Sequence, residues 1–247
     1  MSTLTSGRKY ITLYSSILTT VLMLAVFFVS GLAGHSSTSQ KSRIPISQIN
    51  DQILQGRVIV LDPGHGGSDP GTVGVGRTTE AENVLAICLE LKGMLEQAGA
   101  AVIMTRNKDV NPAGGTSYEY QINGQLAVRT LTAERSKGEI FISIHNDWNS
   151  NSRISGTTSY YYHAEDWLLA DSLQKSLVSC LSSRNIGVKY ANFYVLRNTN
   201  IPSALIEVGF LSNSREAEML AQPWYRSAAA QGLFYGIVDY YERAGII

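Results

Sequence analysis

Short apolar runs and helical repeats of apolar residues alternate along the chain from residue 58 onward. Residues 58–61 form an apolar run that ends at Asp62-Pro63-Gly64, which is typical of a buried strand. Over 80–97 apolar residues recur at helical spacing, and Gly99 follows as a stop signal. The same patterns predict strands over 101–104, 140–144, 157–162, 204–208 and near 193–196, and helices over 124–136, 166–183, 215–221 and 224–243. This alternation predicts an α/β domain with a mainly parallel sheet and helices on both faces.

A different pattern precedes this domain, because residues 10–34 contain no charged residue and Arg8 and Lys9 come just before them. A membrane-crossing helix needs roughly 20 apolar residues, and basic residues keep its near end in the cytoplasm. We therefore expect 1–34 to be an N-terminal membrane anchor, favoured by its length, or a cleaved signal peptide, favoured by Gly31 and Ala33.

Residues 35–50 are polar and serve as a linker, which leaves 51–247 as the folded domain. The N-terminal segment would place this domain outside the cytoplasmic membrane, with the membrane itself as one partner.

Composition narrows the class of protein. Lys+Arg and Asp+Glu both number 20 in the 247 residues, so the formal net charge is zero. Nucleic-acid binding requires a clustered basic face, and none is present. Cys88 and Cys180 lie too far apart to form a zinc motif of paired cysteines. A disulfide is allowed outside the cytoplasm, but two buried thiols are the simpler interpretation.

Four residues with metal-binding or acid–base chemistry fall at one edge of the predicted sheet. His65 follows the first strand, His145 directly follows the strand over 140–144, Glu207 ends its own strand, and Glu80 opens the first helix. Ligands of such sheets bind beyond the carboxyl ends of the strands. Two histidines and a glutamate are a zinc donor set that leaves room for water. A lone histidine after a strand is more often structural than a ligand, whereas the set of three fits a structural role and a metal site about equally well.

Neighbouring residues refine this picture. Glu207 lies in an apolar strand, where burial raises a carboxyl pKa toward values useful for proton transfer. Asp62 either orients a ligand imidazole or caps the turn after the first strand. The glycines beyond it, from Gly64 to Gly76, lack the Gly-Lys-Ser/Thr ending of a phosphate loop. No His-Glu-x-x-His helix is present, so the common metalloprotease motif is absent as well.

Four sequence blocks carry a family resemblance. Residues 60–67 (VLDPGHGG) resemble the opening signature of the zinc-dependent N-acetylmuramoyl-L-alanine amidases of type 3. Residues 104–106 (MTR), 141–145 (FISIH) and 206–213 (IEVGFLSN) resemble later blocks of that family in the same order. The similarity extends over about 58–241, which is essentially the whole predicted domain.

This resemblance implies a fold, a reaction and a site. The fold is a single three-layer α/β domain of the phosphorylase/hydrolase-like kind, with a mixed, mostly parallel sheet. The substrate is peptidoglycan, and the reaction hydrolyses the amide between the lactyl group of muramic acid and L-alanine of the stem peptide. His65, Glu80 and His145 would hold one zinc ion, with Glu207 as the catalytic acid/base. The chain is expected to act as a monomer.

The sequence also departs from the family. Glu82 follows Glu80 closely and is an alternative metal ligand. Asn146-Asp147-Trp148 follow His145 where the family more often has a small residue and then asparagine. Asn146, Arg106 and Asp62 are candidates for contacting the substrate or supporting the ligands.

The expected elements between His145 and Glu207 include no spare helix, which favours a groove open without an activator. The single N-terminal membrane segment is similar to that of the sporulation amidases of the spore cortex. A zinc peptidase acting on stem peptides and an inactive peptidoglycan-binding module are the competing functions.

Overall fold

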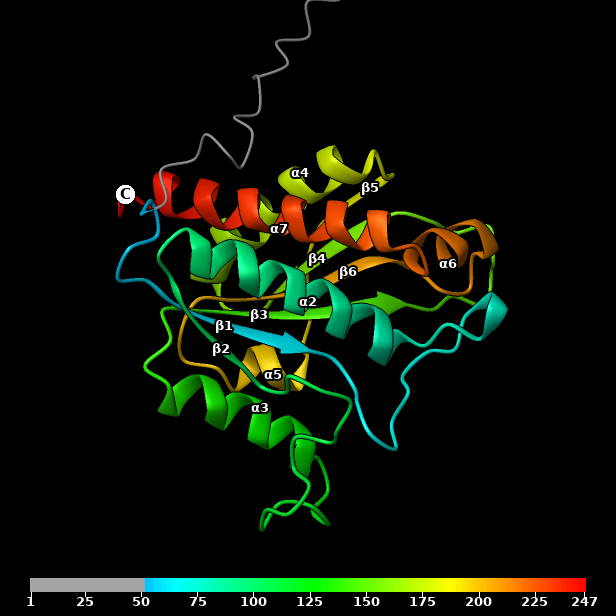
Figure 1. The fold of residues 1–247 in the computed structure, drawn as a ribbon, viewed down its shortest axis with the longest axis horizontal. Helices are drawn as coiled ribbons and strands as arrows, with labels where there is room; N and C mark the ends of the chain where they lie inside the picture. Colours follow the sequence, from blue (N-terminus) through cyan, green and yellow to red (C-terminus); the bar gives the residue numbers. More distant parts are fainter. Residues whose placement is uncertain (1–51) are drawn as a thin grey trace, which may run out of the picture. The chain divides into compact units, whose positions relative to one another are not determined.

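The computed structural model describes residues 52–247, and Figure 1 shows their arrangement. The predicted anchor or signal peptide over 1–34 and the linker over 35–50 lie outside the described residues. Within 52–247, no helix has the length and apolar character needed to cross a membrane.

The centre of the fold is one six-stranded sheet with the order β2-β1-β3-β6-β4-β5. Its strands are β1 (Val58–Pro63), β2 (Ala101–Met104), β3 (Ile140–Asp147), β4 (Thr157–Tyr161), β5 (Asn185–Tyr190) and β6 (Ser203–Phe210). β2, β1, β3 and β6 run parallel to one another, β4 pairs with β6 in the antiparallel direction, and β5 runs parallel to β4. The sheet is therefore mixed and mostly parallel, as predicted.

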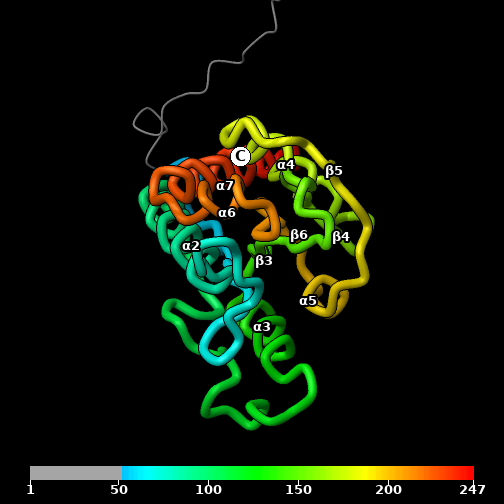
Figure 2. Tube along the Cα trace, turned by 90° about the vertical axis from the view of Figure 1, so that its right-hand side faces the viewer, coloured from blue at the N-terminus to red at the C-terminus, as the bar shows by residue number. Residues whose placement is uncertain are grey.

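Helices cover both faces of this sheet and complete three layers (Figures 1 and 2). One face carries α2 (Glu80–Gln97), α4 (Trp167–Leu181) and α7 (Pro223–Arg243), and the other carries α3 (Gly124–Arg135) and α5 (Tyr194–Arg197). The shorter α6 (Ser214–Leu220), η2 (Val75–Arg77) and η3 (Ala164–Asp166) lie in the connections. The predicted three-layer α/β fold is confirmed.

Helix α2 has the bounds that its apolar spacing predicts. The hydroxyl of Thr79 accepts a hydrogen bond from the Glu82 amide, which satisfies one of the otherwise unpaired donors at the helix start. One stripe of apolar residues is fully buried: Val84, Ile87, Cys88, Leu91 and Leu95. Gly99 follows with φ +94°, a left-handed conformation that ends the helix without the strain a side chain would bring. The Thr79 cap and this termination set the two ends of the helix, and Glu80 is its first residue.

The face covered by α3 and α5 corrects one prediction. The expected strand near 193–196 is the short helix α5, whose Val195 and Leu196 join a buried cluster with Val60, Phe141 and Leu205 from three strands. An apolar run of four residues fits a strand or a helix equally well, so its pattern did not decide the structure. The edge strand β5 was missed because it is partly exposed and contains Gly187 and Lys189.

The two cysteines do not pair with each other. Cys88 is buried in α2, Cys180 is half-buried in α4, and no disulfide joins them in the described part of the chain. Burial raises the pKa of the Cys88 thiol well above its usual value, which keeps this side chain protonated and unreactive.

Candidate active site

The loop that carries His65 has an unusual backbone. His65 has φ +60°, and Gly66 and Gly67 follow with φ +120° and +67°. A non-glycine residue in the left-handed region costs about 1–3 kcal/mol and persists only where its surroundings hold it. The amide of Gly64 donates to the carbonyl of Ile144 at 3.0 Å, which ties this loop to the end of β3.

Two buried arginines supply the rest of that support. Arg106 donates to the carbonyl oxygens of Pro63, Gly64 and Ala81 at 3.0, 2.7 and 2.9 Å. Arg129 of α3 donates to the carbonyls of Pro63 and His65 at 2.7 and 2.6 Å. Arg106 thus joins the histidine loop to α2.

The partner of Arg129 is Asp62, which is completely buried. Asp62 also accepts hydrogen bonds from the hydroxyls of Thr105 and Ser143 at 2.6 and 2.7 Å. Burial alone raises the pKa of Asp62, but the positive charge of Arg129 and these hydrogen bonds outweigh it and hold the pKa below its usual value. Asp62 therefore acts on the His65 backbone through Arg129, and no hydrogen bond joins it to either imidazole in the described residues.

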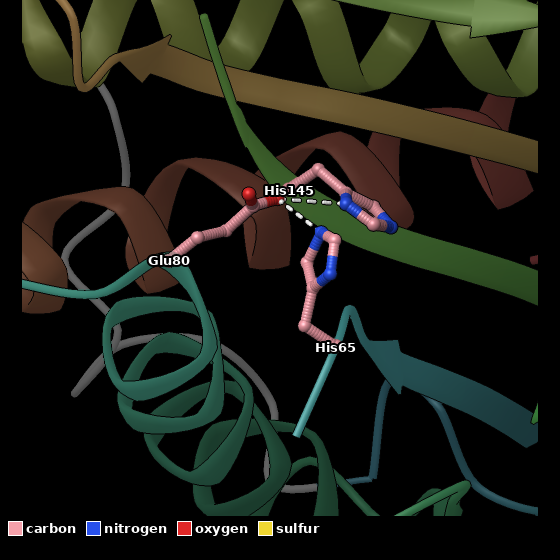
Figure 3. Close-up of side chains that lie close together, drawn as sticks. All are labelled: His65, Glu80 and His145. Atoms are coloured by element: carbon pink, nitrogen blue, oxygen red, sulfur yellow. Dashed lines mark hydrogen bonds and ion pairs between the residues drawn. The ribbon is translucent and has the colours of Figure 1, made fainter. Parts of the chain in front are cut away.

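His65 from the loop after β1, Glu80 from α2 and His145 from β3 converge on one point (Figure 3). One potential ligand atom from each lies within 4.8 Å of the other two. Glu80 Oε1 is 3.1 Å from His65 Nε2 and 2.8 Å from His145 Nδ1. Burial alone would raise the pKa of Glu80, but hydrogen bonds from both histidines dominate and hold it below its usual value. The carboxylate is thus ionised and available as a ligand.

Backbone amides fix the Glu80 side chain from both sides. Oε1 accepts from the amide of Asn146 at 3.0 Å, and Oε2 accepts from the amide of Thr72 at 2.9 Å. The Asn146 side chain donates to the carbonyl of His145, and its Oδ1 is buried without a hydrogen-bond partner among the described residues. Glu82, two positions from Glu80, is exposed and stays outside the cluster.

Asp69 is a residue of the site that the sequence analysis missed. Its Oδ2 lies 2.9 Å from His65 Nδ1, and its Oδ1 accepts from the amide of Gly71 at 3.0 Å. Gln125 of α3 donates to the same carboxylate at 3.3 Å. A carboxylate beside Nδ1 orients the imidazole ring, whose Nε2 lies toward Glu80. The available signal was an acidic residue four positions after a candidate ligand.

Two glycines leave the space that the side chains of the cluster occupy. A Cβ on Gly64 would lie 2.3 Å from Cε1 of His145, and a Cβ on Gly71 would lie 2.7 Å from both Glu80 Oε2 and His65 Cδ2. Real Cβ atoms do not approach other atoms this closely. Glycine at these two positions is therefore a requirement of the cluster itself.

Glu207 lies beside the cluster on the neighbouring strand. In the parallel pair of β3 and β6 it is the register partner of His145. Its Oε2 is buried and has no hydrogen-bond partner among residues 52–247. Burial, reinforced by the negative charges of Glu80 and Asp147, raises its pKa well above the usual value. An unpaired carboxyl next to a metal-competent cluster is suited to proton transfer.

Comparison with known proteins now adds to this geometry. Residues 59–239 match the sequence profile of the N-acetylmuramoyl-L-alanine amidases (Amidase_3). The chain belongs to the N-acetylmuramoyl-L-alanine amidase family. Its enzyme class is therefore amidase, a hydrolase, which confirms the resemblance found in the sequence.

Several amidases illustrate the relationship. The chain is 36% identical over 197 residues to the germination-specific N-acetylmuramoyl-L-alanine amidase of Bacillus subtilis (strain 168), a match that covers 78% of this chain and 83% of that one. It is also 36% identical to the probable cell wall amidase LytH of Staphylococcus saprophyticus, with 78% of this chain and 61% of LytH covered. The chain thus spans less than two thirds of LytH.

A solved amidase has the same fold. The CwlD amidase from Clostridioides difficile, whose structure is in complex with the GerS lipoprotein, superimposes with a TM-score of 0.71 at 32% identity. That match covers 76% of this chain and 99% of the CwlD chain. The whole amidase fold is therefore contained in the described part of the chain.

Proposed function

We propose that this chain is a zinc-dependent amidase that cleaves the bond between the lactyl group of muramic acid and L-alanine in peptidoglycan. The observation that carries the proposal is the convergence of His65, Glu80 and His145 within 4.8 Å. Two imidazoles and one carboxylate are a donor set of catalytic zinc sites. Two donors that each lie about 2.0–2.1 Å from one tetrahedral zinc ion are roughly 3.3 Å apart, and the observed 2.8 and 3.1 Å are close to this separation.

The four residues have two separate roles in this mechanism. His65, Glu80 and His145 hold the zinc ion, and Glu207 exchanges protons with the reactants. When bound, zinc supplies a Lewis acid that polarises the scissile carbonyl and acidifies water. Glu207 takes a proton from the attacking water and returns it to the departing amine of L-alanine. The buried, unpaired Oε2 of Glu207 supports this role because it has no competing hydrogen bond among the described residues.

The proposal extends to where the enzyme acts. Peptidoglycan lies outside the cytoplasmic membrane, and the apolar segment over 1–34 supports delivery to that side, either as an anchor or as a signal peptide. The 36% identity to a germination-specific amidase supports a role in the spore wall. We further propose that the enzyme acts as a monomer.

One experiment separates the amidase from its two alternatives. The full-length chain, purified in detergent with zinc and without any added partner protein, is incubated with muropeptides, and the products are identified by mass spectrometry. Released stem peptides that begin with L-alanine are expected. Shortened peptides that remain attached to muramic acid would identify a peptidase instead, and unchanged muropeptides bound by the protein would identify an inactive binding module.

Metal removal provides the first quantitative prediction. Dialysis against a chelator is expected to abolish amide hydrolysis, and one equivalent of zinc per chain is expected to restore it. Because the ion binds only the folded site, zinc at 100 times its Kd should stabilise the fold by about 2.7 kcal/mol. Differential scanning calorimetry with and without zinc measures this shift. Full activity in the metal-free protein would exclude the proposed mechanism.

A second prediction concerns Asp69, whose side chain is 39% exposed and therefore replaceable without loss of the core. Asp69→Asn is expected to weaken zinc binding by about 10–100-fold, because residues that orient a ligand histidine have effects of this size. Competition with a fluorescent zinc chelator measures the affinity. Glu82→Gln, a matched removal of an exposed carboxylate on the same rim, should leave the affinity unchanged. A loss with Glu82→Gln would restore Glu82 as a ligand.

A further inference from the structure

Lys189 lies on the edge strand β5, two strands away from Glu207. Thr158 of β4 is the register partner of Glu207 in β6 and of Gly187 in β5. Two residues further along β4, Tyr160 is the register partner of Lys189. Register partners on neighbouring strands project from the same face of a sheet. Glu207, Thr158, Tyr160 and Lys189 thus lie on one face of the sheet, in a row that runs from Glu207 to the sheet edge. We call this row of residues the wall of the site.

Local contacts hold this wall in place. The half-buried ring of Tyr160 meets the ring of Phe193 edge to face at 5.2 Å between centroids. Burial raises the pKa of the Tyr160 hydroxyl, and the negative charges of Asp147 and Glu207 add to this rise. The phenol therefore lies within electrostatic reach of both carboxylates.

Lys189, at the outer end of this row of residues, is exposed. None of the ion pairs within the described residues involves Lys189. In contrast, Arg106 donates hydrogen bonds to backbone carbonyls, and Arg129 donates to backbone carbonyls and to Asp62. Lys189 is thus a cation beside the site with donors to spare.

The span of the wall matches the length of a short peptide. Strands lie about 4.8 Å apart and rise about 3.3 Å per residue, which places the Cα of Lys189 about 12 Å from that of Glu207. The four-carbon stem of lysine covers about half of that distance. A carboxylate on the residue after L-alanine lies one to two residue lengths, about 4–7 Å, from the scissile amide. The ammonium can therefore meet this carboxylate while the amide lies at Glu207.

We propose that Lys189 makes the enzyme selective for stem peptides with a free carboxylate, rather than a carboxamide, on the residue that follows L-alanine. This inference rests on the proposed amidase function. Glu207 presents a carboxyl group on this face, and an anionic peptide gains nothing from it. Lys189 supplies the charge-assisted hydrogen bond that offsets the loss of water around the substrate carboxylate.

The test uses two N-acetylmuramoyl dipeptides that differ only in whether the second residue bears a carboxylate or a carboxamide. The full-length, zinc-loaded chain in detergent is expected to cleave the carboxylate form with a kcat/KM about tenfold higher, the size of one partly exposed charged hydrogen bond. Lys189→Met keeps the stem but removes the charge, and it should abolish this preference by slowing cleavage of the carboxylate form alone. Lys189→Arg should retain the preference.

Two controls make the outcomes distinct. Lys175→Met removes an exposed lysine on α4, across the sheet, and should change neither substrate's kcat/KM. Zinc content should stay at one per chain in every variant. Equal cleavage of both dipeptides by the unmodified enzyme, or an equal loss on both in Lys189→Met, would overturn the role of Lys189 alone. Failure of the unmodified enzyme to cleave either dipeptide would instead overturn the proposed function.

Discussion

Replacing Glu207 by glutamine is expected to lower kcat by about 10²–10⁴-fold, the usual contribution of a general acid–base group. The side chain keeps its size, so the packing of β6 is preserved. The amide cannot accept the proton of the attacking water, and the leaving amine then departs without a proton donor. Single-turnover release of stem peptide from a defined muropeptide measures the loss.

The metal content of the same variant tests the assignment of roles. Glu207→Gln is expected to hold one zinc ion per chain with unchanged affinity, because the three proposed ligands remain. Glu80→Gln is the matched comparison, since it is the same chemical change at a carboxylate bonded to both histidines. It should lose zinc and activity together. If Glu207→Gln also lost its zinc, Glu207 would be a ligand and the proton acceptor would have to be another group.

Local pattern predicted most of the fold because most elements bury one regular stripe or one apolar run. Helix α2 and strand β2 have the predicted bounds, because Gly99 between them and the apolar spacing within each are signals that extend over only a few residues. The predictions failed at α5, whose short apolar run fits a strand or a helix equally well, and at β5, whose formation depends on a distant part of the chain. β5 exists because β4 offers it a pairing edge, and that edge is built from distant sequence.

The residues of the candidate site also divide into those that the sequence predicts and those that it does not. His65, His145 and Glu207 follow from the rule that strand ends gather at one edge, together with the family blocks. The supporting residues do not follow from any local pattern. Arg129 lies 64 residues from the His65 carbonyl to which it donates, and Gln125 lies 56 residues from Asp69. Only the packing of α3 on the sheet brings these partners together.

This dependence on α3 explains how a strained loop can hold a ligand. His65 keeps its left-handed backbone because Arg129 donates to its carbonyl and to the carbonyl of Pro63, while Asp69 is bonded to its Nδ1. Arg129 belongs to α3, and Asp69 accepts a hydrogen bond from Gln125 of α3. The proposed metal site is therefore tied to the α3 layer, and loss of the ion pair beneath the loop should disturb both.

Arg129→Met is accordingly expected to destabilise the fold by about 3–5 kcal/mol at neutral pH, because it leaves the buried Asp62 carboxylate without its cation. In the unmodified protein the pKa of Asp62 lies below its unfolded value, so its ionisation stabilises the fold above that value and this stability is lost on acidification. In Arg129→Met burial dominates and raises the pKa. The ionised carboxylate then opposes folding, and the penalty disappears once acid protonates it in both states.

The difference in unfolding free energy between the two proteins should therefore be largest near pH 7 and shrink as the pH falls toward about 4, near the unfolded pKa of aspartate. Urea unfolding at several pH values measures it. Arg135→Met, at an exposed position of the same helix, should stay within about 0.5 kcal/mol of the unmodified protein. Asp62→Asn in the Arg129→Met background should recover part of the loss. A penalty independent of pH would mean that Arg129 acts through its bonds to the carbonyls of Pro63 and His65, with neutralisation of Asp62 contributing nothing.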